Sequence, residues 1–192
     1  PEDGYYTDVT IRILPGIVSP LRHVTGPDLD WVIVRENSEG EYSGVGGRAH
    51  RGSPLEVATD VTIFTRAGVE RIMRFAFRLA RSRPRKLLTV VTKSNAQRHG
   101  MVMWDEIAVE IAREFPDVAW DKMLVDAMTM RMVLKPQSID TTTEVASLPG
   151  VSVGGLAPSD ANDAASTVLL AAWQAGDSNA LQVGDVVLAI GN

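Results

Sequence analysis

Short β-rich runs alternate with longer amphipathic segments between residues 29 and 134, and this alternation constrains the fold more than any other feature. Residues 29–36 form a mostly apolar run typical of a buried strand. Residues 65–82 repeat apolar side chains at helical spacing and end before Pro84, which cannot continue a helix. Such alternation indicates an α/β fold. The sequence predicts strands at 29–36, 56–64, 86–91 and 118–124, helices at 65–82, 103–115 and 126–134, and a glycine-rich loop or excursion at 40–52.

The distribution of charge predicts a boundary near residue 141. All 19 basic residues of the 192-residue chain lie before it, whereas 5 of the 24 acidic residues lie after it. The net charge of −5 therefore belongs entirely to the last quarter of the chain. A composition change of this size indicates two segments, 1–141 and 142–192.

Composition also excludes several classes of protein and site. The chain has no cysteine, which excludes disulfides, thiolate metal sites and a thiol nucleophile and fits a reducing compartment. No apolar run is long enough to span a membrane, and the first ten residues have neither a basic start nor an apolar stretch. We therefore expect a cytoplasmic protein that does not bind membranes.

A dense polar cluster follows the first expected strand. In α/β proteins, ligands bind at the carboxyl ends of strands, where loops present side chains. The alternative is a charged, solvated turn. The cluster consists of Arg35, Glu36, Asn37, Glu39, Glu41 and Tyr42.

Two further residues stand at the ends of expected strands. Lys93 follows residues 86–91, where a desolvated lysine can act as a general base; the alternative is an ordinary surface lysine. Asp126 lies at a strand-to-helix junction, where its simplest role is to cap the following helix.

A basic stripe occupies one face of the expected helix 65–82. It consists of Arg71, Arg74, Arg78 and Arg81 at helical spacing. Basic stripes can contact phosphates, but this one lacks interleaved aromatic residues and lies in a segment without net charge. We expect a solvated or interface face and no nucleic-acid partner.

Four long motifs resemble one enzyme family. LPGIVSPLR, DLDWVIVRENSEGEYSGVGGRAHRG, the long stretch from IFTRAGVERIM to MVMWDE, and WDKMLVDAMTMRMVLKP occur in the order found in the metal-dependent, NAD-linked β-decarboxylating dehydrogenases. That family includes isocitrate and isopropylmalate dehydrogenases. The motifs in this chain are most similar to those of tartrate and D-malate dehydrogenases. The similarity runs from residue 11 to residue 141.

The resemblance implies a partial isocitrate/isopropylmalate dehydrogenase-like fold, mainly the small dimer-forming domain, and oxidative decarboxylation of a 2-hydroxy acid such as tartrate or D-malate. It implies NAD and a Mg or Mn ion as cofactors and a homodimer whose arm, at about 42–60, crosses to the second subunit. Lys93 and Asp126 would serve the partner's active site. By the same resemblance, Arg35 binds a substrate carboxylate, Tyr42 protonates the enol carbon, Lys93 takes the hydroxyl proton, Asn95 lies near the nicotinamide, and Asp126 binds the metal.

The sequence also departs from the family pattern. Val9 stands where the family has a substrate-binding arginine, and after Asp140 the run expected to carry two further metal-binding aspartates is replaced by unrelated sequence. We therefore expect this chain, as it stands, to be inactive or impaired. Residues 167–192 resemble the end of a PDZ domain, so the tail is expected to be β-rich. The alternative function is a non-catalytic dimerisation or interaction module with a partial peptide-binding tail.

Overall fold

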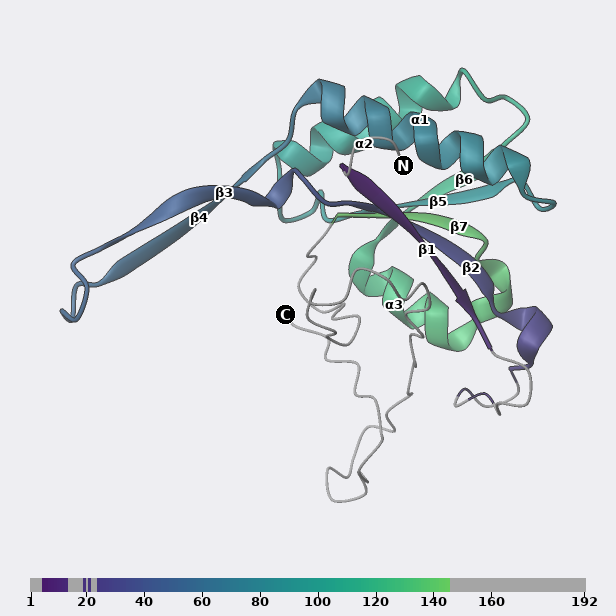
Figure 1. The fold of residues 1–192 in the computed structure, drawn as a ribbon, viewed down its shortest axis with the longest axis horizontal. Coiled ribbons are helices and arrows are strands. Elements are labelled where there is room, and N and C mark those ends of the chain that lie inside the picture. The colour runs from purple at the N-terminus through teal and green to yellow at the C-terminus, as the bar shows by residue number, and fades with distance from the viewer. Residues whose placement is uncertain (1–4, 14–18, 20, 22–23, 146–192) are drawn as a thin grey trace, which may run out of the picture.

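The computed structural model describes residues 5–13, 19, 21 and 24–145, and its main body is one five-stranded sheet. The strand order is β1-β2-β7-β5-β6; β1 is antiparallel to β2 and the other neighbours are parallel. Helices α1 and α2 cover one face and α3 covers the other, as Figure 1 shows. The predicted α/β class is thus confirmed. The elements are β1 (Tyr6–Arg12), β2 (Asp30–Glu36), β3 (Gly40–Ala49), β4 (Val57–Ile63), α1 (Arg66–Ser82), β5 (Leu87–Thr92), α2 (Gly100–Ala112), β6 (Ala119–Leu124), α3 (Val125–Leu134) and β7 (Thr141–Val145), with short 3-10 turns at Gly26–Asp28 and Pro136–Ser138.

Helices on both faces explain why β2 and β5 carry long apolar runs. Successive side chains of a strand point to opposite faces, so the strands feed two cores. Val34 of β2 and Val90 of β5 pack against α1 and α2. Trp31 and Ile33 of β2, with Val91 of β5, belong to the second core, which includes residues of α3. The sheet is therefore fixed from both sides, and its strand ends are held in place.

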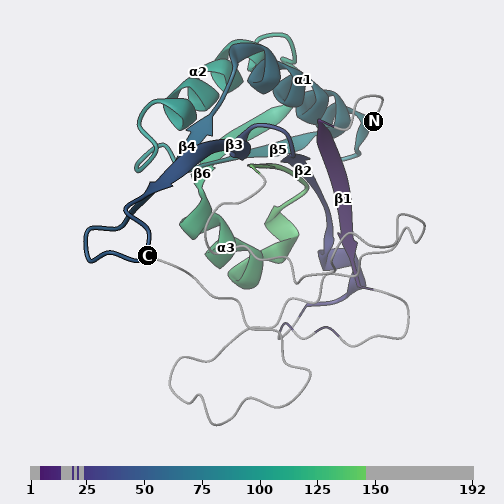
Figure 2. The ribbon, with the colours of Figure 1, turned by 60° about the vertical axis from the view of Figure 1, so that its left-hand side comes forward.

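Strands β3 and β4 form a separate two-stranded antiparallel ribbon that projects from the body (Figures 1 and 2). We call this ribbon the arm. The sequence predicts a loop or excursion at 40–52, but the structure has strand β3 over most of that range, because its glycines pair with β4 despite their weak strand propensity. Almost all arm side chains are exposed.

Three further elements differ from the sequence prediction. Helix α2 begins and ends three residues before the predicted 103–115, and its C-cap residue Arg113 still has helical backbone angles. Pro116 disfavours the helical conformation at the preceding residue, Phe115, so the helix could not have reached the predicted end. Strand β1 and strand β7 were not predicted at all. β7 lies between β2 and β5 in the middle of the sheet although it begins with three threonines.

The predicted basic stripe on α1 is divided among several contacts. Arg74 pairs with Glu114, just after the end of α2, whereas Arg71 lies over the ring of Tyr5 and Arg81 over the ring of Phe115.

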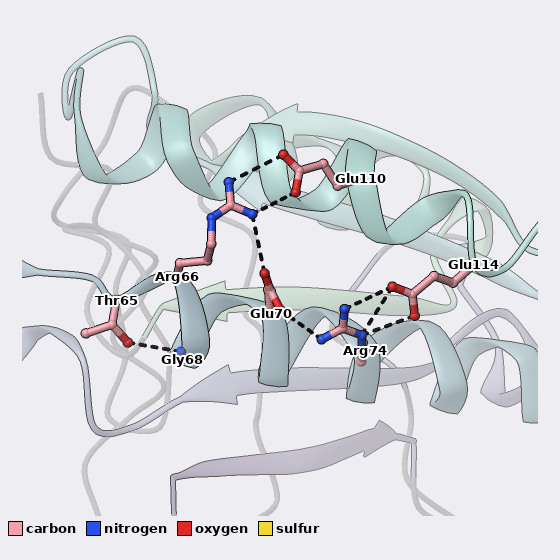
Figure 3. A network of polar contacts seen from close by, with 7 residues as sticks. All are labelled: Thr65, Arg66, Gly68, Glu70, Arg74, Glu110 and Glu114. Carbon is pink, nitrogen blue, oxygen red and sulfur yellow. Dashed lines mark hydrogen bonds and ion pairs between the residues drawn. The ribbon is translucent and has the colours of Figure 1, made fainter.

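Arg66 donates to Glu110 at 2.7 Å and Arg74 donates to Glu114 at 3.0 Å, while Glu70 lies between the two arginines (Figure 3). These bonds raise the pKa of Arg74, chiefly through Glu114, and lower the pKa of Glu114, chiefly through Arg74. We call these five residues the α1–α2 ladder.

Candidate functional site

The carboxyl ends of the parallel strands bring the polar side chains predicted from the sequence to one edge of the sheet. Arg35 is the penultimate residue of β2, Lys93 follows β5 directly, and Asp126 lies in the first turn of α3, just after β6. Only β7 lies between β2 and β5, so the ends of those two strands are about 10 Å apart. This is the edge at which open α/β sheets bind ligands.

Lys93 and Asp126 form an ion pair. The ammonium Nζ of Lys93 lies 2.5 Å from Oδ2 of Asp126. The lysine side chain is 20% exposed and the aspartate side chain 42% exposed, so the carboxylate faces solvent more than the ammonium does. Asp126 makes no side-chain hydrogen bond that caps α3, which removes the simplest structural role predicted for it. We call this pair the Lys93 half-site.

Arg35 and Tyr42 form a second pair, which we call the Arg35 half-site. Nη2 of Arg35 donates to the Tyr42 hydroxyl at 3.1 Å, and the guanidinium lies 5.7 Å from the centre of the ring. Tyr42 is 53% exposed. A guanidinium beside an exposed phenol can bind an anion while the phenol supplies a proton nearby.

Two carboxylates fix the turn that joins β2 to the arm. Glu36 is 1% exposed, and its Oε1 accepts hydrogen bonds from the backbone and side chain of Ser38, both at 2.7 Å. Glu39 accepts from the backbone of Thr65 at 2.9 Å and from its hydroxyl at 2.6 Å. Thr65 in turn caps α1 by accepting from the backbone of Gly68. The polar cluster is therefore an ordered turn that holds the arm on the body.

Asn95 lies apart from both half-sites. It is exposed and lines a groove of about 520 Å³ between α2 and β6, with Trp120 and Lys122 on the strand side and Asp105 on the helix side. Lys122 donates to Asp105 at 2.8 Å, and Glu106 adds a second carboxylate to the lining of the groove. The groove begins at Ser94, the residue next to Lys93, but does not include Lys93 itself.

The predicted residues thus form two pairs and one separate amide, and the contact that joins the pairs was not predicted. Gln97 donates to Glu41 at 3.3 Å, which links the loop after β5 to the root of the arm. Glu41 belongs to the predicted cluster, whereas no sequence pattern singles out Gln97. Among the described residues, no three His, Cys, Asp or Glu side chains gather closely enough to hold a metal ion.

Comparison with known proteins identifies the same enzyme family that the sequence motifs resemble. The sequence pattern of isocitrate/isopropylmalate dehydrogenases matches residues 10–146. A probable tartrate dehydrogenase/decarboxylase of Agrobacterium vitis is 73% identical over 139 residues, which is 72% of this chain and 39% of the relative. The decarboxylating D-malate dehydrogenase of Escherichia coli is 44% identical over 138 residues, which is 72% of this chain and 38% of the relative.

A solved structure supports the same assignment. Isocitrate dehydrogenase from Methylococcus capsulatus is 34% identical, with a TM-score of 0.63 over 73% of this chain and 40% of that protein. None of the described helices combines the length and apolarity needed to cross a membrane. The predicted division into 1–141 and 142–192 stays a prediction, and most of the second segment, including the PDZ-like residues 167–192, lies outside the described residues. The chain spans about two fifths of the length of the curated relatives it matches, and it belongs to the isocitrate/isopropylmalate dehydrogenase family.

Proposed function

We propose that this chain carries substrate-binding and proton-transfer residues of an enzyme that oxidises and decarboxylates a small 2-hydroxy acid such as tartrate or D-malate. The observation that carries the proposal is the placement of both half-sites at one edge of a parallel sheet, in a member of a dehydrogenase family. The names of the relatives give the substrate class. We also propose a cytoplasmic location, which the absence of cysteine fits.

Each half-site has a distinct role in this reaction. Arg35 binds a substrate carboxylate through its planar fork of donors. Lys93 accepts the proton of the C2 hydroxyl, directly or through one water, as hydride leaves C2. The carboxylate on C3 then departs as carbon dioxide, the electrons of the broken bond form an enolate across C2 and C3, and Tyr42 protonates C3. Lys93 can accept this proton only after its ammonium has lost one, and Asp126, in contact with Nζ, or a water is the acceptor available to it.

The described residues do not complete a divalent metal site. Mg²⁺ and Mn²⁺ prefer about six oxygen ligands, whereas Asp126 is a single carboxylate already in contact with Lys93. We propose Asp126 as one ligand of a larger set. For NAD, which supplies the hydride acceptor when bound, we propose Asn95 as a contact at the groove.

A homodimer follows from the same proposal, with the arm as the crossing element. Its exposed apolar side chains support an interface on the arm and also support the alternative function, a non-catalytic dimerisation module. Turnover separates the two functions. Incubation with NAD, Mn²⁺ and D-malate or tartrate should form NADH if the site is complete, and Lys93→Ala should abolish that turnover.

Binding tests the proposal even where turnover is impaired. We expect D-malate or tartrate to bind the chain in an NMR titration, and Arg35→Lys to weaken binding about tenfold or more, because lysine cannot make a bidentate contact. Arg12→Lys is the matched control, since Arg12 pairs with Asp30 at the opposite end of β2. Equal binding by both variants would contradict the role of Arg35.

A further inference from the structure

The contact between Gln97 and Glu41 is the feature of the site that the proposed function does not use. Gln97 lies in the loop between β5 and α2, and Glu41 is the second residue of β3. Nε2 of Gln97 donates to Oε1 of Glu41 at 3.3 Å. The contact therefore joins two segments that are 56 residues apart in the sequence.

Each partner is attached directly to one half-site. The backbone amides of Ala96 and Gln97 both donate to the carbonyl oxygen of Lys93 at 2.9 Å, so the loop folds back on the residue that carries the ammonium. The carbonyl of Gln97 then accepts from Met101 in α2 at 3.2 Å. On the other side, Glu41 directly precedes Tyr42. A change in the distance between Gln97 and Glu41 would thus move one half-site relative to the other.

The arm does not need this contact to stay on the body. Phe64, which follows β4, lies so close to Gly100 that a Cβ atom there would be 2.5 Å from the ring. The same ring packs edge-on against Trp104, with 6.1 Å between ring centres. Apolar burial of this kind, together with the bonds from Thr65 to Glu39, holds the arm root.

The contact is also a poor source of stability. Oε2 of Glu41 and Oε1 of Gln97 are both buried and accept no hydrogen bond from the described part of the chain. Desolvating two acceptors costs more than one long hydrogen bond returns. The contact adds little stability but joins the segments that carry the two half-sites. Its role is therefore better explained by the spacing that it sets between those half-sites.

We propose that Glu41 and Gln97 are positioning residues that fix the Lys93 half-site relative to the Arg35 half-site. The inference rests on the proposed function for its catalytic meaning, although the spacing itself is a property of the fold. In a two-fold dimer the same spacing within each subunit would also set the geometry of any site shared between subunits.

Fluorine NMR of the full chain labelled with 3-fluorotyrosine tests the inference without substrate. The chain has three tyrosines, so three resonances are expected, and Tyr42→Phe identifies the one at the arm root. Gln97→Glu places two carboxylates in contact and should shift or split the Tyr42 resonance. The same variant should weaken the hydrogen-exchange protection of the amide at position 97, while Tyr5 and Tyr6 keep their resonances.

A double variant in which the two side chains are exchanged distinguishes a positioning role from general damage to the fold. Glu41→Gln combined with Gln97→Glu restores one hydrogen bond with donor and acceptor reversed, so the Tyr42 resonance should return. Gln137→Glu, at an exposed glutamine in the turn after α3, makes the same chemical change and should move nothing. Gln97→Ala serves if Gln97→Glu does not fold.

An unmoved Tyr42 resonance in a folded Gln97 variant, or no recovery in the exchanged pair, would overturn the proposal. Because the readout needs neither substrate nor cofactor, its failure is distinct from a failure of carboxylate binding or turnover.

Discussion

Single residues in the arm show how narrowly its pairing is constrained. A Cβ atom on Gly46 would lie 2.3 Å from the backbone oxygen of Thr59 on the opposite strand, a distance that no side chain can occupy. A Cβ atom on Gly47, the next residue, would meet nothing within 4 Å. The two glycines are adjacent in sequence and identical in chemistry, so they form a natural matched pair.

We predict that Gly46→Ala separates β3 from β4 locally. Forcing a methyl group against backbone costs about 1–3 kcal/mol, and a two-stranded ribbon has little stability to lose. Hydrogen exchange should therefore accelerate at the amides of β4, while α1 and the main sheet remain protected. Gly47→Ala should leave the arm unchanged. Equal exchange in the two variants would show that β3 and β4 do not pair in this register.

The sequence predicts Lys93 and Asp126 as site residues but does not predict Gln97, and the difference has a physical reason. Lys93 and Asp126 follow apolar runs, so the sequence places them at strand ends, and the structure brings them together. Gln97 carries no such signal. Its significance comes from its contact with Glu41, which lies 56 residues earlier at the root of the arm, and no local pattern contains that contact.

At the scale of elements, α1 and α2 are joined by the α1–α2 ladder as well as by apolar packing. The arginines lower the pKa values of Glu70, Glu110 and Glu114 below their ordinary value of 4.5. A carboxylate with a lowered pKa stabilises the fold above its unfolded-state pKa, and this contribution is lost as the pH falls through the folded-state pKa. The ladder should therefore weaken only in acid.

We predict that Glu114→Gln flattens the dependence of the unfolding midpoint on pH below about 4.5. At neutral pH the same variant should lower the midpoint slightly, because exposed ion pairs contribute little, and added salt should shrink the difference. Glu106→Gln is the control, since Glu106 lies on α2, which ends two residues before Glu114, and no ion pair is found for Glu106 among the described residues. Identical acid profiles for the two variants would contradict the role of the ladder. Thermal unfolding followed by circular dichroism measures all three proteins.

Elements with a clear hydrophobic period were predicted well, whereas β7 was not. Its residues Thr141, Thr142 and Thr143 are almost completely buried, although threonine is usually found at the surface. The hydroxyl of Thr143 accepts a hydrogen bond from the backbone of Val91 at 3.1 Å, so part of its polarity is satisfied inside the sheet. A strand whose burial depends on its neighbours cannot be read from its own composition.

At the scale of the whole molecule, the order of the strands decides where function can reside. β7 is the last described strand in sequence, yet it separates β2 from β5 and so sets the spacing of the strand ends from which Arg35 and Lys93 extend. The predicted alternation of strands and helices gives the α/β class but not this order. Strand order depends on pairing between segments more than a hundred residues apart, which is invisible to local periodicity.

The arm exposes many apolar side chains for an element that projects from the body of the protein. Tyr42, Val45, Val57, Val61 and Ile63 are each at least 40% exposed, and Leu55 at the tip is 76% exposed. Apolar residues clustered on a projecting element are typical of an interaction surface, and in the proposed homodimer a second copy of the chain would cover them.

We expect the chain to sediment as a dimer at micromolar concentration and the double variant Val45→Thr, Val61→Thr to shift it toward monomer. The two valines face each other across the arm, and threonine keeps their shape and strand propensity while removing apolar surface. Val109→Thr is the control, since Val109 is 47% exposed on α2, away from the arm. A monodisperse monomer before substitution would contradict the dimer. If the double variant on the arm and Val109→Thr weaken the dimer equally, the effect is not specific to the arm, and the arm is not the dimer interface.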